Sequence, residues 1–472
     1  MELIGIILII IYSLNIIAVI SLVFFENRSY SSLLVWLLVL MALPGVGLFA
    51  YVIFGKGPDI GKKKKFLTKI TEDEKYFAHL EMQKKLLIED THLSDAAAQL
   101  AYYNLIDQGS VLTDTNKLEV MHDIAAMYET MFQDIENATE YVNILFFIIK
   151  GDEYGKRLRE LLIKKVNEGV KVRLIYDHVG SFRLRPFFFR RLKKAGGEVY
   201  SFLPSIFKFF FRNVNYRNHR KIVIVDGKIA YTGGANVGRE YANKDKKLYP
   251  WHDTQIRVEG DAVTLINLRF MQDYNFSAHK AEKMKFTPQK KAGNKVMQII
   301  SSGPDSRDEK IKLAYIKAIY NARTKVYIQT PYFIPDESFI AALATAAKSG
   351  VDVRIMIPGI ADKKSVYLST TFYMKELLPH GVRFYTYNGF MHSKTLLIDD
   401  EITSIGTFNI DIRSFKQNFE MTVFIYDKAV NAQMTKAFFN ETKNAKLVPA
   451  DYKGRIIRRF FESIARLFTP LM

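Results

Sequence analysis

The sequence contains no cysteine among its 472 residues. This excludes disulfide bonds, thiolate nucleophiles and cysteine-ligated zinc or iron–sulfur centres, although it does not fix the redox compartment. Acidic residues are also in deficit, because 49 Asp and Glu stand against 67 Lys and Arg, for a formal net charge of +18. So basic a chain is expected to associate with a polyanion, either nucleic acid or an anionic membrane surface.

Charge is missing altogether from two runs near the start of the chain. Residues 3–25 carry no charge, and a helix of this length crosses a hydrocarbon core of roughly 30 Å. A second uncharged run covers 31–55, where Pro44 is compatible with a kinked membrane helix. A cleaved signal peptide fits less well, because no small-residue cleavage site follows the first run. We predict a transmembrane hairpin over residues 1–57.

Basic residues follow this hairpin. Lys56 and the lysines at 62–65 come directly after the second run, and positive residues beside a span stay in the cytoplasm. We therefore expect a multi-pass protein of the bacterial cell membrane with everything after the hairpin in the cytoplasm. The lysine run also fits a solvated linker, and both interpretations can hold. Residues 58–118 are expected to form a basic helical linker.

From about residue 119 strand-like and helix-like segments alternate, and one series of three occurs twice. The first series is strand 140–149, helix 158–169 and strand 170–177, and the second is strand 324–333, helix 338–350 and strand 351–358. The pattern VKVRLIY at 170 returns as VDVRIMI at 351, an offset of 181 residues that is far above solenoid periods. The fold class is therefore expected to be α/β, with a mixed sheet flanked by helices in each of two duplicated domains. We place these domains at 119–290 and 291–450.

One motif occurs once in each half. The first copy is HRKIVIVD from His219 to Asp226 and then GGAN to Asn236, and the second is HSKTLLID from His392 to Asp399 and then GTFN to Asn409. Both copies read H-x-K-x4-D followed by G-[GT]-x-N at one spacing. Two unrelated core histidines would not be expected to share this pattern at matching places of a repeat.

Strand geometry suggests what the motif does. Side chains two apart on a strand share a face, so His219 and Lys221 point the same way, as do His392 and Lys394. An ammonium group repels a metal cation, and we therefore expect no metal or other cofactor. It can hold a phosphate instead, while the imidazole attacks or protonates. Two such half-sites facing each other would surround one phosphodiester.

The remaining polar residues are assigned from their places along the strands. Asn236 and Asn409 follow small residues and can donate amide hydrogens to phosphate oxygens. By parity, Asp226 and Asp399 lie on the strand face opposite the histidines, which favours structural roles.

Two acids further along the chain are better partners for the imidazoles. Asp253 heads the strand-like segment DTQIRV, and Glu420 heads the corresponding segment EMTVFI. A carboxylate there could hold the imidazole tautomer and stabilise its positive form. An exposed carboxylate on an edge strand is the alternative.

The duplicated motif resembles that of the phospholipase D superfamily. The flanks NYRNHRKIVIVDG, GGANVGREY, WHDTQIRVEG and TPYFIPD resemble bacterial cardiolipin synthases in particular, and the likeness covers essentially the whole chain. Thr407 stands where the family usually has Ser and keeps the hydroxyl. The resemblance implies two phospholipase D-like sandwich domains. It also implies a catalytic set that includes both aspartates: His219, Lys221, Asp226, His392, Lys394 and Asp399.

The resemblance further implies metal-independent transfer between two phosphatidylglycerol molecules through a phosphohistidine, giving cardiolipin and glycerol. Either histidine could be the nucleophile, with His219 slightly favoured. The alternative is a membrane-bound phosphodiesterase, either a lipid hydrolase or a nuclease. A nuclease needs no membrane span, so phosphatidylglycerol and anionic lipids are the expected partners rather than nucleic acid. A non-catalytic lipid-binding scaffold is disfavoured by the two intact motifs, and a homo-oligomer is left open.

Two further segments suggest contact with a membrane. The aromatic residues at 186–189 and 202–211 are expected to form either an entrance at the membrane surface or part of the core. The tail 451–472 contains apolar residues at helical spacing among arginines. It predicts a basic amphipathic helix at an anionic interface, with a packed terminal helix as the alternative.

Overall fold

The computed structural model describes residues 2–26, 30–52, 82–85, 87, 92–204, 215–283, 289–306 and 308–467. In the first half of the chain the strands are β1 (Leu112–Met121), β2 (Tyr141–Phe146), β3 (Lys171–Asp177), β4 (Glu198–Phe202), β5 (Arg217–Asn218), β6 (Ile222–Val225), β7 (Ile229–Gly233), β8 (Trp251–His252) and β9 (Gln255–Glu259). In the second half they are β10 (Lys295–Ser302), β11 (Lys325–Gln329), β12 (Phe333–Ile334), β13 (Asp352–Pro358), β14 (Arg383–Tyr387), β15 (Phe390–Met391), β16 (Thr395–Ile398), β17 (Ile402–Gly406), β18 (Ile410–Asp411), β19 (Asn418–Tyr426) and β20 (Ala445–Leu447).

Helices precede, connect and follow these strands. Around the first half they are α6 (Asp95–Gln108), α7 (Ile124–Glu136), α8 (Glu153–Asn167), α9 (Arg190–Ala195) and α10 (Asp261–Ala278). In the second half they are α11 (Lys310–Asn321), α12 (Glu337–Lys348), α13 (Lys364–Leu377), α14 (Ile412–Lys416), α15 (Lys428–Thr442) and α16 (Ile456–Leu467).

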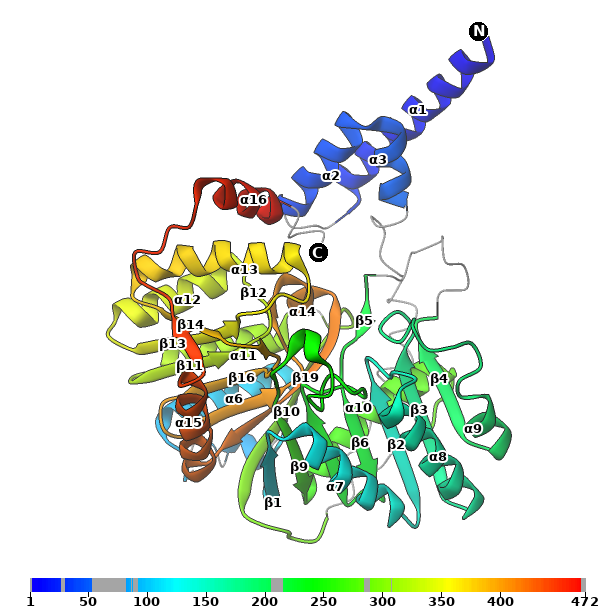
Figure 1. Cartoon of the computed structure of the whole chain (residues 1–472), viewed down its shortest axis with the longest axis vertical. Helices are drawn as coiled ribbons and strands as arrows, with labels where there is room; N and C mark the ends of the chain where they lie inside the picture. Colours follow the sequence, from blue (N-terminus) through cyan, green and yellow to red (C-terminus); the bar gives the residue numbers. More distant parts are fainter. Residues whose placement is uncertain are drawn as a thin grey trace.

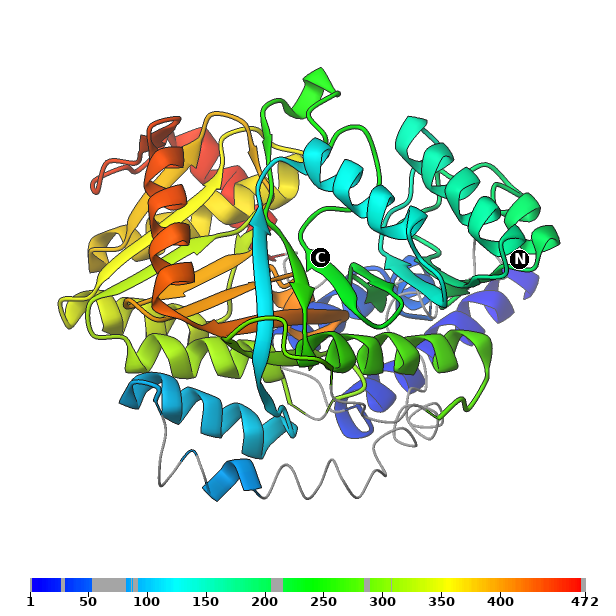
Figure 2. The ribbon, with the colours of Figure 1, turned by 90° about the horizontal axis from the view of Figure 1, so that it is seen from below.

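Within the described residues one sixteen-stranded sheet passes through both halves of the chain. Its order is β20-β14-β13-β11-β16-β17-β19-β10-β1-β9-β7-β6-β2-β3-β4, with β5 beside β19. Read outward from the central β1–β10 pair, the two halves repeat the same succession of strands. Figure 2 shows β1 between them. This arrangement confirms the duplicated α/β fold.

The predicted βαβ units are present in both halves. β2 and β3 pair in parallel across α8, and β11 and β13 pair in parallel across α12. An aspartate caps the start of each helix, Asp152 for α8 and Asp336 for α12. Gly169 and Gly350, with φ of 89° and 91°, turn the chain from each helix into the next strand, a conformation that favours glycine.

The expected linker differs from the structure at its end. Helix α6 fits a helical linker, but it packs into the core of the second half through Ala97, Leu100 and Ala101. Strand β1 then begins at Leu112, although helix was expected up to residue 118. Its sequence LTDTNKLEVM contains five consecutive polar residues, 113–117, which conceal a strand that lies at the centre of the sheet.

Helices cover both faces of the sheet and form three layers with it (Figure 1). Helices α7 and α8 pack on one face of the first half, and α11 and α12 on one face of the second. A third apolar cluster, on the remaining face, is shared by α10 and α15 and spans both halves. This shared core and the continuous sheet hold the two halves together.

The N-terminal region contains α1 (Glu2–Phe24), α2 (Tyr30–Ala42) and α3 (Pro44–Ala50). By length and composition, α1 is the one described helix that could cross a membrane, whereas the apolar part of α2 covers only Leu33–Ala42. The second predicted span is interrupted before Pro44, which lacks the N–H needed to continue the helix. Its last residues, 53–55, lie outside the described residues, so the two-span hairpin stays a prediction.

The predicted aromatic entrance also lies partly outside the described residues, which omit 205–214. Of the rest, Phe202 is buried in the core, Phe189 is buried, and Phe187 is 79% exposed. The tail forms α16, which packs on α13.

Candidate active site

Two exchanged strands bring the motif histidines to the boundary between the halves. β5 pairs with β19 of the other half, and the His219 N–H donates to the Phe419 carbonyl at 2.9 Å. In the same way β15 pairs with β8, and the His392 N–H donates to the His252 carbonyl at 2.7 Å. Each histidine therefore lies against the half to which it does not belong.

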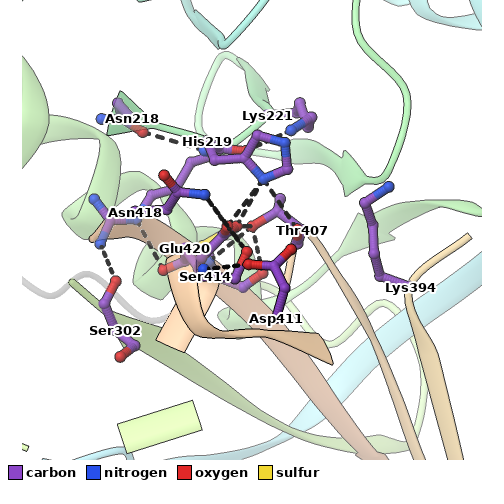
Figure 3. Close-up of polar contacts among 12 residues, drawn as sticks. Asn218, His219, Lys221, Ser302, Lys394, Thr407, Asp411, Ser414, Asn418 and Glu420 are labelled. Atoms are coloured by element: carbon purple, nitrogen blue, oxygen red, sulfur yellow. Dashed lines mark hydrogen bonds and ion pairs between the residues drawn. The ribbon is translucent and has the colours of Figure 1, made fainter. Parts of the chain in front are cut away.

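His219 is held by two acceptors from the second half (Figure 3). Its Nδ1 lies 3.0 Å from a carboxylate oxygen of Glu420 and 3.1 Å from the Thr407 carbonyl oxygen. The Glu420 carboxylate is fully buried. With a proton on Nδ1, the neutral ring keeps its lone pair on Nε2, the atom that can attack phosphorus.

Further donors fix the Glu420 carboxylate. It accepts hydrogen bonds from the Thr407 hydroxyl, from Ser414 Oγ at 2.9 Å and from Asn418 Nδ2 at 3.2 Å. Burial raises the pKa of Glu420, but the facing His219 and Lys221 outweigh burial and leave the pKa below its ordinary value. Glu420 is therefore an ionised and immobilised partner for the imidazole.

His392 is held in the same manner by an acid from the first half. Its Nδ1 lies 2.6 Å from Asp253 Oδ2, and Asp253 also accepts from the Thr254 N–H at 2.9 Å. The Trp251 ring packs 4.7 Å from the imidazole, centroid to centroid. Asp253 and Glu420 were both expected to partner imidazoles, and the structure brings them there in crossed pairs.

The motif lysines complete a strongly charged centre. Each lysine donates to the backbone carbonyl of the histidine in the same motif copy. Lys221 Nζ lies 2.5 Å from the His219 carbonyl oxygen, and Lys394 Nζ donates to the His392 carbonyl oxygen. Both ammonium groups act electrostatically on both imidazoles. Figure 3 shows Lys221 and Lys394 reaching this centre from different elements. The structure thus gathers both histidines and both lysines at one place.

Burial dominates the proton affinities at this centre. It lowers the pKa of His219 to about 4 and that of His392 to about 3, so both imidazoles are neutral near pH 7 without substrate. Burial also lowers the pKa of Lys221 to about 7 and that of Lys394 to about 8. An entering phosphodiester anion favours the protonated form of every one of these groups.

The side chains of the two motif asparagines already make hydrogen bonds within the protein. Asn236 Oδ1 accepts from the Ile148 N–H at 3.0 Å, and its Nδ2 donates to the Tyr241 hydroxyl at 3.1 Å. The Asn409 side chain hydrogen-bonds to Asp411. Because an amide nitrogen has two hydrogens, a contact with phosphate remains compatible with these bonds.

Comparison with known proteins agrees with this geometry. Residues 131–249 and 315–442 match the family described as "Cardiolipin synthase, PLD-like domain", and 13–56 match "Phospholipase_D-nuclease N-terminal". The chain is 40% identical to a cardiolipin synthase of Listeria monocytogenes serotype 4a (strain HCC23) over 485 aligned residues, covering 100% of both chains. It is likewise 40% identical, with full coverage of both, to the major cardiolipin synthase ClsA of Bacillus subtilis (strain 168).

The chain belongs to the cardiolipin synthase family of phospholipase D-like proteins. A solved phosphatidylserine synthase of Haemophilus influenzae Rd KW20 shares the fold, with a TM-score of 0.59 at 13% identity over 75% of this chain and 93% of that one.

The two aspartates of the cardiolipin synthase motif follow β6 and β16 and make their hydrogen bonds there, which favours a structural role over the catalytic one implied by the resemblance. Asp226 accepts from the backbone N–H groups of residues 139–141, and Asp399 accepts from those of residues 323–325. Lys221 and Asp226 flank opposite ends of β6, so the strand separates Asp226 from the lysine. Both aspartates instead fix the entry of the neighbouring strand, as the parity argument indicated.

Arg220 is a site residue of this cardiolipin synthase-type centre that the motif conceals. It lies between His219 and Lys221, is fully buried, and donates two hydrogen bonds to Asp273 at 2.8 and 2.9 Å. Its Nε also donates to the Glu420 carbonyl oxygen at 3.0 Å. A buried arginine requires a counter-ion, but the sequence does not say which acid supplies it.

Proposed function

We propose that this chain is a cardiolipin synthase that transfers a phosphatidyl group from one phosphatidylglycerol to another, with His219 as nucleophile. The observation that carries the proposal is the pair of buried imidazoles, each with Nδ1 on an ionised carboxylate of the opposite half. In this arrangement both Nε2 atoms are available to one phosphodiester, one to attack it and one to move protons. The full-length likeness to curated cardiolipin synthases supports the lipid substrate.

The reaction has two steps. First, His219 Nε2 attacks phosphorus, the bond from phosphorus to the glycerol headgroup oxygen breaks, and His392 donates a proton to that oxygen. Second, His392 removes a proton from the terminal hydroxyl of another phosphatidylglycerol, whose oxygen attacks phosphorus and breaks the bond to nitrogen. Glycerol leaves after the first step and cardiolipin after the second, and both histidines return to their starting state.

The assignment of roles rests on the contacts of the two rings. His219 Nδ1 faces both Glu420 and the Thr407 carbonyl, whereas His392 Nδ1 faces Asp253. The double contact fixes the tautomer with an unprotonated Nε2, as a nucleophile requires. His392 must gain a proton to act as the acid, and the negative charge of the bound phosphodiester raises its pKa in that direction. Lys221 and Lys394 hold the phosphate oxygens, with Asn236 and Asn409 as further donors.

We further propose that the enzyme meets its substrate at the cytoplasmic face of the cell membrane, anchored by an N-terminal hairpin. Helix α16 supports this placement because it exposes apolar side chains and buries a charged one, the reverse of a helix on a soluble surface. Its large apolar residues point outward, with Ile456 81% and Phe460 63% exposed, while Glu462 is buried against Lys375 of α13. In Figure 1 α16 lies on the same side of the molecule as α1–α3. An apolar outer face flanked by arginines suits an anionic bilayer surface.

The decisive experiment is product analysis with purified enzyme and phosphatidylglycerol alone. We expect cardiolipin and free glycerol in equal amounts, with little phosphatidic acid. One phosphodiester replaces another, so the reaction should be nearly isoenergetic and added glycerol should reverse it. Products dominated by phosphatidic acid would instead identify a hydrolase. A lipid adduct trapped on His392, and none on His219, would reverse the two histidine roles.

A further inference from the structure

A second cluster of histidines lies behind the active site. Among the described residues, the side chains of His122, His252 and Glu441 place one candidate ligand atom each within 4.8 Å of the others. His122 follows β1, His252 ends β8, and Glu441 comes from α15 of the other half. The proposed transfer reaction uses none of these three side chains.

The candidate ligand atoms of the cluster lie close together, and two buried imidazole nitrogens have no hydrogen-bond partner. Nε2 of His122 and Nε2 of His252 are both buried and have no protein hydrogen-bond partner. His252 Nε2 lies 2.9 Å from Glu441 Oε1, but not in the alignment of a hydrogen bond. The two rings are nearly parallel, with centroids 5.5 Å apart. Buried imidazole nitrogens normally have a partner, so their convergence on one carboxylate points to a bound ligand.

The surroundings hold the ligand atoms in place. His122 Nδ1 lies 3.3 Å from Thr254 Oγ1, which leaves Nε2 as its ligand atom. Gln329 Nε2 donates to the second oxygen of Glu441 and leaves Oε1 toward His252. Outer partners of this kind orient imidazole and carboxylate ligands in metal sites.

Carboxylates rather than ammonium groups are the leading charged neighbours of His122. The groups that act most strongly on His122 are His252, Glu441 and Asp253, two of which are carboxylates. At His219 and His392 the neighbouring ammonium groups repel a cation. Here two imidazoles and a carboxylate form a common three-ligand set for zinc, with a further position left for water. Neighbouring ligands of such a site are roughly 3.3 Å apart, since each lies about 2.0–2.1 Å from the ion.

We propose that His122, His252 and Glu441 bind one divalent transition-metal ion of the zinc class, which bridges the two halves of the chain. The ion would clamp β1 and β8 of the first half to α15 of the second. It lies next to the His392–Asp253 pair, because His252 directly precedes Asp253, but it takes no part at phosphorus.

The test uses the full chain in detergent, stripped with a chelator and then titrated with Zn²⁺ by calorimetry. We expect one saturable Zn²⁺ per chain and a rise of the apparent melting temperature on the order of 3–5 °C at saturation. His122→Ala and Glu441→Gln should each weaken binding at least about 100-fold, whereas His92→Ala, at an exposed histidine, should not. Circular dichroism confirms that each variant is folded.

A second measurement does not depend on the variants. Co²⁺ added to the stripped wild-type chain should give the visible absorption of a four- or five-coordinate site, and one equivalent of Zn²⁺ should abolish it. Absence of saturable binding by the wild-type chain overturns the proposal. So does equal binding by the wild-type chain and both ligand variants, which would place the ion elsewhere. Neither readout involves lipid transfer, so failure here leaves the proposed reaction untouched.

Discussion

Replacement of Glu420 by glutamine tests the crossed pairing of acids and histidines. At 3.0 Å and an effective dielectric constant of about 20, the attraction between Glu420 and a positive His219 is about 5 kcal/mol as an upper bound. A hydrogen bond to a charged group typically contributes about 1.5–3 kcal/mol. Glutamine also presents an amide N–H that favours the tautomer with a protonated Nε2. A loss of about 3–5 kcal/mol corresponds to a fall in kcat of about 10²–10⁴-fold.

The assay measures cardiolipin formed from phosphatidylglycerol in detergent micelles, with circular dichroism to check folding. Ser414→Ala is the matched control, because it removes one 2.9 Å hydrogen bond to Glu420 but leaves the carboxylate and its contact with His219. We expect the control to lose far less activity than Glu420→Gln, because the ionised carboxylate keeps its contact with His219 and its hydrogen bonds from the Thr407 hydroxyl and Asn418. Turnover of Glu420→Gln equal to that of Ser414→Ala would refute the orienting role of Glu420.

Three further predictions follow from the site and its surroundings. Because burial lowers the pKa of Lys221 to about 7 and that of Lys394 to about 8, kcat/KM should fall as pH rises from 7 to 9, when the ammonium forms that hold phosphate are lost; a flat profile would contradict this. Asp226→Ala should lower the apparent melting temperature by a few degrees yet leave kcat nearly unchanged, since the carboxylate accepts only from the Thr139 hydroxyl and the backbone N–H groups at the start of β2; a kcat loss comparable to that of Glu420→Gln would return Asp226 to the chemistry. Deletion of residues 453–472 should raise the apparent KM for phosphatidylglycerol in anionic mixed micelles but not kcat, and the difference should shrink at high salt; an unchanged KM at low salt would mean that α16 is only a packing element.

Much of the site could be predicted from the sequence because strand parity is a local property. Side chains two apart in an extended segment share a face, and the structure brings both histidines and both lysines to one centre, although all four residues lie between strands rather than on them. Asp226 likewise lies in the turn after β6, where it hydrogen-bonds to the start of β2. The repeat of the motif and of the βαβ order similarly indicated the duplicated α/β fold.

The sequence did not reveal β1 as a strand, because residues 113–117 are five consecutive polar residues and no apolar run marks the segment. Its place at the centre of the sheet depends on pairing with β9 and with β10, which lies about 180 residues further along the chain. Local propensity carries no information about such a partner, so the charged segment before residue 119 was expected to be helical.

The tertiary structure alone decided which acid serves which histidine. The sequence offered Asp253 and Glu420, but only the exchange of β5 and β8 between the halves shows that His219 takes Glu420 and His392 takes Asp253. The His122 cluster is likewise invisible in the sequence, since its members lie on three distant elements with no ligand spacing. Parity and repeats are local features of the sequence, whereas pairing across the molecule depends on how the two halves of the sheet join at β1 and β10.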